Sequence, residues 1–524
     1  MRVSLPLLHL CLALIGASCA AVSPRPPLEG APVVVAVEAG AIEGRALDGV
    51  RAFRGIPYAA APLAALRWRP PQPVTAWSGT RAAVSFGNDC LQHPLPTSID
   101  PGSGLPMSED CLYLNVWAPA GSKARRPVMV WIHGGGFTIG SGALAATDGA
   151  ALTRQGVVVV TLNYRLGRFG FFAHPALTRA HPDEPTGNYG LMDQIAALEW
   201  VKRNIAAFGG DRADITVFGE SAGGGSVLAL MGSPMARGLF QKAIVESGGG
   251  RDQLPGLDHP AAATPAGDAA GRVFAAKAGL TDPDAAALRA LPAEKVLGDL
   301  GFLNNSNRDD YAGMVIDGRV VTGNPAAIFA RGAEAPVPLI IGFNSGELAG
   351  ARAFTGAWTR QAAAKFGSRE AALRKLYDPH GGDEGLTTDL LSDLVFVEPA
   401  RFLARAHARA GHPVFLYQFD YVAEARRGAA QGAGHASEIP FVFDTVGGID
   451  PKATAQDRAT ATAMSSYWTR FAATGNPNGG GQPTWPVYRV AADTLLNLSP
   501  AGPAPLSDRS RGRLDFLEES TGAP

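Results

Sequence analysis

Phe218-Gly219-Glu220-Ser221-Ala222-Gly223-Gly224 is the stretch that decides the fold of this chain. The preceding residues, 214–218, form a β-branched and aromatic run typical of a buried strand, and residues 226–231 open as a helix. Gly-x-Ser-x-Gly at a strand-to-helix turn holds its serine in a strained backbone conformation that lifts the hydroxyl above the sheet. The alternative is an ordinary glycine-rich loop, but the flanking strand and helix favour Ser221 as a nucleophile.

A serine nucleophile needs a base to take its proton, and His435 is the candidate. It lies in the small-residue loop Gly432–Glu438, between the strand-like runs 414–419 and 439–443. We expect the other histidines considered to be structural or solvated. They are His9 near the N-terminus, His407 in a helix-like run of alanine and arginine, and five that each neighbour a proline, as in exposed turns: His174, His181, His259, His380 and His412.

The acid of the set is expected between the serine and the histidine, because the hydrolase fold that carries this motif has the chain order Ser, Asp/Glu, His. Residues 337–342 read as a strand, and Glu347 follows just past its C-terminal end. Glu347 is therefore the candidate acid. The alternatives are Glu438, which lies three residues past His435, and, on chain order alone, Asp317 and Asp309.

An oxyanion-binding loop is indicated by residues 128–132, a strand that runs into Gly134-Gly135-Gly136. Backbone without side chains can approach a substrate oxygen closely, and each donor aimed at the developing oxyanion is typically worth about 3 to 4 kcal/mol in the transition state. The donors would be backbone N–H groups of this loop together with that of Ala222. A triple glycine alone is often a mere flexible turn, but the serine motif strengthens the interpretation.

With these residues in place, the chain resembles the type-B carboxylesterases, in the cholinesterase-like branch of the α/β-hydrolases. The similarity covers nearly everything after the first residues. Its motifs are Phe53-Arg54-Gly55-Ile56-Pro57-Tyr58-Ala59, Leu66-Arg67-Trp68, Ser108-Glu109-Asp110-Cys111-Leu112-Tyr113-Leu114-Asn115-Val116, Asn163-Tyr164-Arg165, Gly187-Asn188-Tyr189-Gly190-Leu191, Phe208-Gly209-Gly210-Asp211, Trp468-Thr469-Arg470-Phe471-Ala472 and Gly475-Asn476-Pro477-Asn478.

The resemblance implies a mostly parallel central sheet flanked by helices, with helical lid insertions. By it, the catalytic triad is Ser221, Glu347 and His435, the oxyanion donors are Gly135, Gly136 and Ala222, and Arg67 and Glu109 form a buried ion pair near the first disulfide. Two positions depart from the family pattern. The family usually has Asp-Glu-Gly around the acid where this chain has Gly346-Glu347-Leu348, and Ala436 replaces the usual glycine after the histidine.

Composition is consistent with one large domain, expected over residues 31–520. Apolar residues make up 46% of the chain, which is enough for a large core, and the net charge of −1 gives no indication of a nucleic-acid partner. Residues 255–307 and 358–394 are expected to be the helical regions beside the active site. We found no metal-ligand spacing and no phosphate or dinucleotide motif, so no cofactor is implied.

Residues 1–20 have the three-part form of a secretory signal, and residues 21–30 read as a proline-rich spacer. Cleavage after Ala20 would give a secreted or periplasmic protein without a transmembrane segment. Residues 14–19 also resemble a loose lipobox, in which Cys19 would become a lipid anchor. Soluble export is favoured because Gly16 is a poor residue for its position in a lipobox.

Cys11 and Cys19 belong to this leader, which leaves Cys90 and Cys111 in the mature domain. Two cysteines in an exported chain usually pair, and the resemblance places them on the family's first disulfide. Two buried free thiols are the alternative if the leader is not an export signal.

The functional expectation is an exported serine hydrolase that cleaves carboxylic esters through an acyl-enzyme. The alternatives are an amide, carbamate or thioester hydrolase with the same residues, or a non-catalytic binding domain. In cholinesterases a tryptophan within the first disulfide loop holds the substrate's cation, but Leu91 to Asp110 contains no aromatic residue. A small neutral ester is therefore the expected substrate.

Overall fold

The computed structural model describes residues 25–95, 102–121, 124–251, 253–261, 264–302, 304–305, 308–348, 359–360, 362–378, 384–428, 430–507 and 510–521. The predicted leader, including Cys19 and Ala20, and the first part of the predicted spacer lie outside these residues. Among the described helices, none is long and apolar enough to cross a bilayer.

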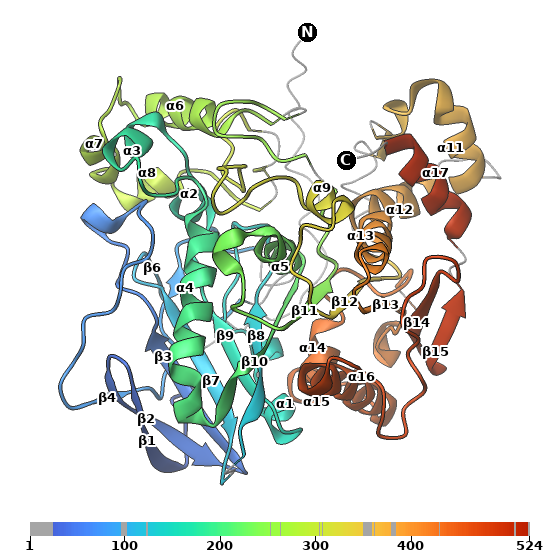
Figure 1. Ribbon diagram of the computed structural model, residues 1–524, viewed down its shortest axis with the longest axis horizontal. Coiled ribbons are helices and arrows are strands. Elements are labelled where there is room, and N and C mark those ends of the chain that lie inside the picture. The colour runs from blue at the N-terminus through green and yellow to red at the C-terminus, as the bar shows by residue number, and fades with distance from the viewer. Residues whose placement is uncertain are drawn as a thin grey trace, which may run out of the picture.

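The described chain is built on a 13-stranded sheet with the order β1-β2-β3-β7-β9-β8-β10-β11-β12-β13-β14-β15, and β4 pairs with β2 (Figure 1). The strands from β9 through β8 and β10 to β14 run parallel, whereas β1, β2, β3 and β7 at one edge and β15 at the other are antiparallel. This arrangement confirms the predicted α/β fold. The strands are β1 (Ala31–Val37), β2 (Gly40–Leu47), β3 (Val50–Pro57), β4 (Thr80–Ala82), β7 (Tyr113–Pro119), β8 (Arg126–Ile132), β9 (Val158–Leu162), β10 (Gly210–Glu220), β11 (Lys242–Glu246), β12 (Leu339–Asn344), β13 (Val414–Phe419), β14 (Thr494–Ser499) and β15 (Gly502–Ser507).

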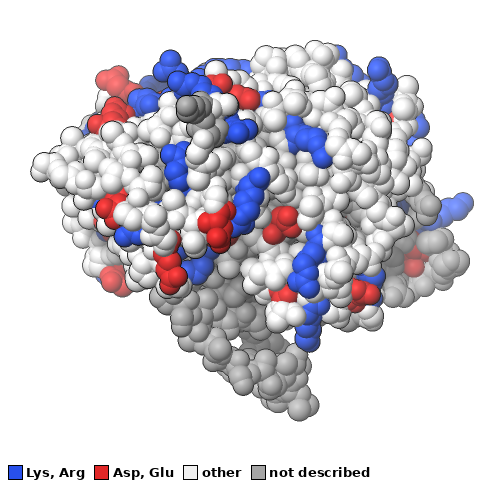
Figure 2. All heavy atoms as spheres, turned by 90° about the horizontal axis from the view of Figure 1, so that it is seen from below, with Lys and Arg blue, Asp and Glu red and all other residues white. Residues whose placement is uncertain are grey.

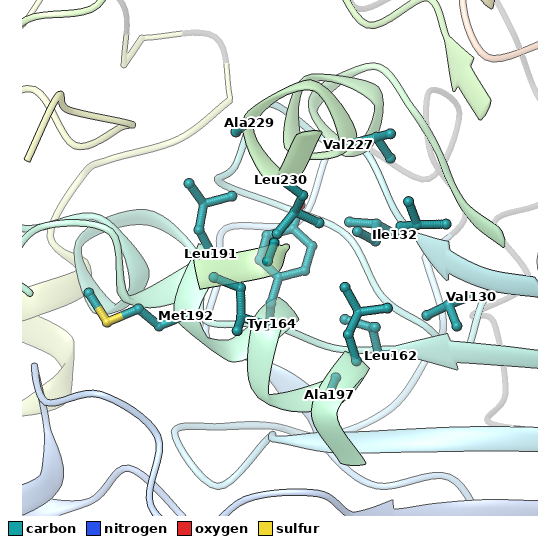
Figure 3. Close-up of a cluster of buried hydrophobic side chains, with 14 of the residues drawn as sticks. Val130, Ile132, Leu162, Tyr164, Leu191, Met192, Ala197, Val227, Ala229 and Leu230 are labelled. Atoms are coloured by element: carbon teal, nitrogen blue, oxygen red, sulfur yellow. The ribbon is translucent and has the colours of Figure 1, made fainter. Parts of the chain in front are cut away.

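Both faces of the sheet are buried, because successive side chains of each strand point to opposite faces. In β8, Val130 and Ile132 belong to the apolar cluster on one face, and Met129 and Trp131 to the cluster on the other. Helices α4, α5 and α13 cover the first face, and α1, α14 and α16 cover the second (Figure 1). Figure 3 shows the packing of the first face, where side chains of α4 and α5 meet those of β8 and β9. These helices are α1 (Ala150–Arg154), α4 (Tyr189–Asn204), α5 (Ala222–Gly232), α13 (Glu398–Arg409), α14 (Ile439–Val442) and α16 (Ala455–Thr474).

Helices lie in both regions where the sequence predicts them (Figure 1, upper left and upper right). Within residues 255–307 these are α6 (Gly267–Lys277), α7 (Ala285–Arg289) and α8 (Ala293–Leu297). Within residues 358–394 they are α11 (Glu370–Tyr377) and α12 (Glu384–Ser392), and a π-helical turn, Asp393–Val397, leads into α13. The other α-helices with described bounds are α2 (Gly167–Gly170), α3 (Pro175–Ala180), α9 (Pro325–Ala330), α15 (Val446–Ile449) and α17 (Arg511–Thr521).

The prediction of a strand over residues 439–443 is wrong, because this run forms the short helix α14. A short apolar run cannot be assigned to helix or strand from its periodicity alone. Pro440 lies in the first turn of the helix, where its fixed φ suits a helix and its missing N–H costs nothing. The loop that carries His435 therefore leads into a helix that packs against α16.

The predicted disulfide between Cys90 and Cys111 is present, with both cysteines buried. Next to it, Arg67 and Glu109 form a two-point ion pair, with Nε–Oε2 and Nη2–Oε1 distances of 2.7 and 2.5 Å. Arg67 Nη1 also donates to the carbonyl of Leu291, 2.5 Å away. The ion pair thus ties the disulfide loop to the segment between α7 and α8.

The surface is mixed in charge on the face shown in Figure 2, where basic and acidic side chains are interspersed over a mostly uncharged surface. This mixture agrees with the overall net charge of −1.

Candidate active site

Ser221 lies at the turn between β10, which ends at Glu220, and α5, which begins at Ala222. Its φ of 55° is in the left-handed region, where a residue with a side chain is strained. A Cβ atom at Gly223 would lie 2.0 Å from the carbonyl oxygen of Ile132. Glycine is therefore required at this position, and the turn has the strained conformation that the sequence predicts.

His435 and Glu347 are in direct contact. His435 Nδ1 lies 2.6 Å from Glu347 Oε2, and the backbone N–H of His435 donates to the Glu347 carbonyl at 3.0 Å. Glu347 Oε1 accepts hydrogen bonds from Ser247 Oγ at 2.6 Å and from the backbone N–H of Asn344 at 2.8 Å. Three donors thus converge on the buried carboxylate of Glu347 and fix its position beside the imidazole.

The three alternative acids make no described contact with His435. Glu438 accepts a short hydrogen bond from Asn344 Nδ2 and makes no described contact with His435. Asp317 accepts the backbone N–H groups of residues 319–321 and therefore stabilises a turn. Asp309 lies at the surface, where Lys277 Nζ is 2.5 Å from its carboxylate. Of the four candidate acids, only Glu347 contacts the histidine within the described part of the chain.

Glu220 is a site residue to which the sequence analysis gave no role. His435 Nε2 lies 3.2 Å from Glu220 Oε1, and among the described contacts there is no hydrogen bond between Ser221 Oγ and this ring nitrogen. The one available signal was the position of Glu220 directly before the serine. Ser247, which donates to Glu347, was missed as well, because its partner is 100 residues away in the chain.

The charges around His435 alter its pKa. Burial alone would lower the pKa, but the carboxylates of Glu220 and Glu347 outweigh burial and raise it to about 10. For Glu220, burial and Glu347 raise the pKa although the nearby histidine lowers it. The ring of Phe396 lies 4.6 Å from the imidazole, so the charged groups face an apolar side chain.

The glycine loop lies beside the nucleophile. A Cβ atom at Gly134 would be 3.0 Å from Ser221 Cβ. Gly135 and Gly136 have φ values of 97° and 59°, which glycine adopts without strain. Gly136, Ser221 and Ala222 line one cavity of about 240 Å³, and Gly135 is the adjoining residue of the loop.

This cavity is apolar. Its other lining side chains include Leu228, Leu254, Met314, Val395 and Phe396, and none of the described residues that line it is charged. A strained serine and a glycine-rich loop at an apolar cavity, together with a Glu–His pair whose imidazole is 24% exposed, are the parts that nucleophilic acyl transfer requires.

The sequence model of the carboxylesterase family matches residues 31–380 and 382–509. Similar proteins include fumonisin B1 esterase of Sphingopyxis macrogoltabida, which is 36% identical over 486 residues that cover 89% of this chain and 86% of that protein. Para-nitrobenzyl esterase of Bacillus subtilis (strain 168) is 36% identical over 480 residues, covering 89% of this chain and 94% of that protein.

Solved structures give the same result. A structure of PNB esterase superposes with a TM-score of 0.78 at 33% identity, covering 92% of this chain and 99% of the other. The carboxylesterase EST55 of Geobacillus stearothermophilus at pH 6.2 also has a TM-score of 0.78, at 34% identity, and covers 93% of this chain and 100% of the other. Sequence and fold therefore agree over almost the whole described chain.

Proposed function

The chain belongs to the carboxylesterase family and is a carboxylic ester hydrolase, and from that premise we propose that it cleaves its substrates through an acyl-enzyme formed on Ser221. His435 takes the proton of the serine hydroxyl as the oxygen attacks the ester carbonyl, and it then protonates the leaving alcohol. Glu347 orients the imidazole and stabilises its cation. Water attacks the acyl-enzyme in the second half of the reaction, with His435 again as the base.

The backbone N–H groups of Gly135, Gly136 and Ala222 are proposed to bind the oxyanion. What supports this assignment is the location of the glycine loop beside Ser221 and the cavity that Gly136 and Ala222 share with it. Donors fixed on backbone need no reorganisation as charge develops on the oxygen.

The observation that carries the proposal is the 2.6 Å contact between His435 and Glu347, next to a serine with a φ of 55°. In the structure the second ring nitrogen faces Glu220 rather than the serine. Hydrogen bonds between catalytic groups are often long or poorly aligned before substrate binds, so the missing serine–histidine bond does not count against the assignment.

The proposed substrate is a small neutral ester, because the cavity at Ser221 has no charged lining residue and a volume of about 240 Å³. Amides, carbamates and thioesters could react with the same residues. A non-catalytic binding domain is disfavoured, since such domains typically lack the serine or another member of the triad.

The proposed location is outside the cytoplasm, by export through the leader in residues 1–20, with lipidation at Cys19 as the alternative. The intact mass of the mature protein distinguishes the two: soluble export predicts an N-terminus at Ala21, whereas the lipoprotein route predicts a diacylglyceryl group on Cys19.

Rapid-mixing kinetics with p-nitrophenyl esters of two to sixteen carbons test the mechanism and the acyl preference together. An acyl-enzyme predicts a burst of p-nitrophenol for esters whose deacylation is slow, and a series of esters identifies the acyl length that fits the cavity. A linear release without a burst for every ester, combined with no trapped acyl group on Ser221 after acid quenching, would contradict the proposal.

A further inference from the structure

Glu220, Glu246, Gly342 and Tyr417 form one transverse row across four parallel strands behind the nucleophile. Glu220 of β10 pairs with Glu246 of β11, Glu246 pairs with Gly342 of β12, and Gly342 pairs with Tyr417 of β13. Paired residues on neighbouring strands lie about 4.8 Å apart and point to the same face. Two carboxyl side chains are therefore neighbours at the C-terminal ends of β10 and β11, beside Ser221.

The face of this row follows from strand alternation. Phe218 and Ile244, each two residues before a glutamate of the row, belong to the apolar cluster under α16, so both glutamates point toward that helix. Trp468 of α16 donates from Nε1 to Glu246 Oε1 at 2.8 Å. Its ring lies 5.3 Å from that of Tyr417, which is therefore on the same face.

Tyr417 leans along the row toward Glu246. A Cβ atom at Gly342 would lie 2.2 Å from Tyr417 Cδ1, so the phenol ring covers the glycine that separates the two residues. The Tyr417 hydroxyl and Glu246 Oε2 are both buried and have no described hydrogen-bond partner. Tyr417 and Glu246 are themselves fully buried.

The supply of hydrogen-bond donors distinguishes the buried carboxyls. Glu347 receives three donors, from His435, Ser247 and Asn344. Glu246 receives one, from Trp468, and Glu438 receives one side-chain donor, from Asn344, while each of the two has a second oxygen without a described partner. A buried carboxylate needs donors or a cation to remain ionised, and Glu246 receives a single donor among the described contacts.

No cation faces Glu246 in the described part of the chain. The groups around it are Glu220 from β10, Glu438 directly before α14, Tyr417 from β13 and the uncharged indole of Trp468 from α16. Burial raises the pKa of Glu246 well above its usual range, and Glu438 and Glu220 raise it further although the Trp468 bond lowers it. His435 faces Glu220 at 3.2 Å, whereas Glu246 has no such partner among the described residues, so of these two adjacent buried carboxyls Glu246 is the one that disfavours charge near neutral pH.

We propose that Glu246 is held as the uncharged carboxylic acid in this row, and that it is a positioning residue which leaves Glu220 as the one member of the row that bears charge beside His435. The proton is assigned to Glu246 Oε2, because Oε1 accepts the hydrogen bond from Trp468. The inference rests on the proposed function, because its role is to limit the negative charge near the base and the oxyanion.

The consequence for catalysis appears at alkaline pH. When Glu246 loses its proton to solvent, a second negative charge enters the row and raises the pKa of His435 through Glu220. It also opposes the oxyanion, because Ser221 N–H donates to the Glu246 carbonyl at 2.9 Å and the two residues are therefore adjacent. We expect kcat, after its rise as His435 loses its proton, to fall at higher pH as Glu246 ionises.

Infrared difference spectroscopy of Glu246→Gln against the wild type at neutral pH tests the protonation state directly. The amide oxygen of glutamine can still accept from Trp468, so the variant removes the acid with little change in shape. We expect loss of one C=O band of a protonated carboxylic acid, and also loss of the alkaline decline in kcat. An unchanged set of protonated-acid bands would overturn the proposal.

Trp468 provides a second measurement that needs no variant of Glu246. Its indole N–H resonance, in protein labelled with ¹⁵N-tryptophan and assigned by Trp468→Phe, should shift as Glu246 ionises. We expect the resonance to stay constant through neutral pH and to shift at alkaline pH. A shift confined to acidic pH, where an ordinary glutamate titrates, would show that Glu246 is already ionised and would overturn the proposal.

Tyr417→Phe is the matched control, because it perturbs the same row without removing a carboxyl. It should keep the acid band and the alkaline decline that Glu246→Gln loses. The infrared and NMR results do not depend on turnover, so they test the protonation of Glu246 separately from the acyl-enzyme mechanism. Loss of the proposed function would appear instead as the absence of an acyl group on Ser221.

Discussion

His435 Nε2 lies 3.2 Å from Glu220 Oε1, so the side chain directly before the nucleophile faces the ring nitrogen that must take the proton. A carboxylate beside the imidazole stabilises the protonated ring, so Glu220 affects the pH at which His435 can act as a base. The other ring nitrogen is already occupied, since Glu347 Oε2 lies 2.6 Å from Nδ1.

The pH dependence of kcat/KM measures the effect of Glu220 on the pKa of His435. A base must be unprotonated to act, so kcat/KM rises with pH as His435 loses its proton. Burial lowers the pKa of His435, but Glu220 and Glu347 raise it by more, to about 10. The rise in kcat/KM should therefore occur at a higher pH than for an ordinary histidine. Glu220→Gln removes one raising charge and should move the rise to lower pH.

Glu199→Gln is the control for this experiment, because the Glu199 side chain is 48% exposed and lies on the outer side of α4. It should leave the profile of kcat/KM where it is. A profile that is flat from pH 5 to 9, or one that Glu220→Gln moves to higher pH, would be incompatible with a histidine base facing Glu220.

The identity of the acid is tested by comparing two glutamate variants. Glu347→Gln should lower kcat by roughly 10³ to 10⁴, because a neutral amide no longer supports the imidazolium or fixes its tautomer. Glu438→Gln should cost far less, since Glu438 makes no described contact with His435. Steady-state kinetics of both variants decide the question, and the reverse order would assign the acid to Glu438.

The serine turn could be predicted from sequence because residues 219–223 themselves carry its conformational requirements: a strained serine flanked by glycines. The row behind it could not. Glu220 and Glu246 become neighbours only through the register of β10 and β11, and 26 residues separate them in the chain. Similarly, nothing local to His435 shows that Glu347 rather than Glu438 meets its ring.

His407 shows the same limit away from the active site. The sequence predicts its helix correctly, as α13, but gives no sign of its partner. His407 Nδ1 lies 2.7 Å from Glu334 Oε1 and Nε2 lies 2.9 Å from the Val337 carbonyl, with both side chains fully buried. Both imidazole nitrogens of His407 therefore have an oxygen partner, and the ring is fixed between Glu334 and the Val337 carbonyl.

Breaking this buried pair should destabilise the protein without affecting the active site. Glu334→Gln weakens the buried contact with His407, and we expect the free energy of unfolding to fall by about 1 to 3 kcal/mol. Urea denaturation measures the change. Glu38→Gln, which breaks an ion pair whose two side chains are 48% and 60% exposed, is the control and should cost less than about 1 kcal/mol. Equal small losses in both variants would argue against a stabilising contact between His407 and Glu334.

Substrate charge is tested with butyrylthiocholine and its uncharged dimethylbutyl analogue. A desolvated cation–π contact is worth about 2 kcal/mol, or roughly 30-fold in specificity. Residues 91–110 contain no aromatic side chain that could supply the contact, so kcat/KM should be similar for the two esters. A tenfold or larger preference for the cation would mean that another aromatic residue replaces the missing tryptophan.

Covalent labelling with a fluorophosphonate, read out by peptide mass spectrometry, tests the central claim most directly. The account predicts a single adduct on Ser221 that forms with loss of esterase activity, no adduct in Ser221→Ala, and a fall in turnover on the order of 10⁵ or more in that variant. An adduct on another residue, or a Ser221→Ala protein that keeps more than about a tenth of wild-type activity, would contradict it.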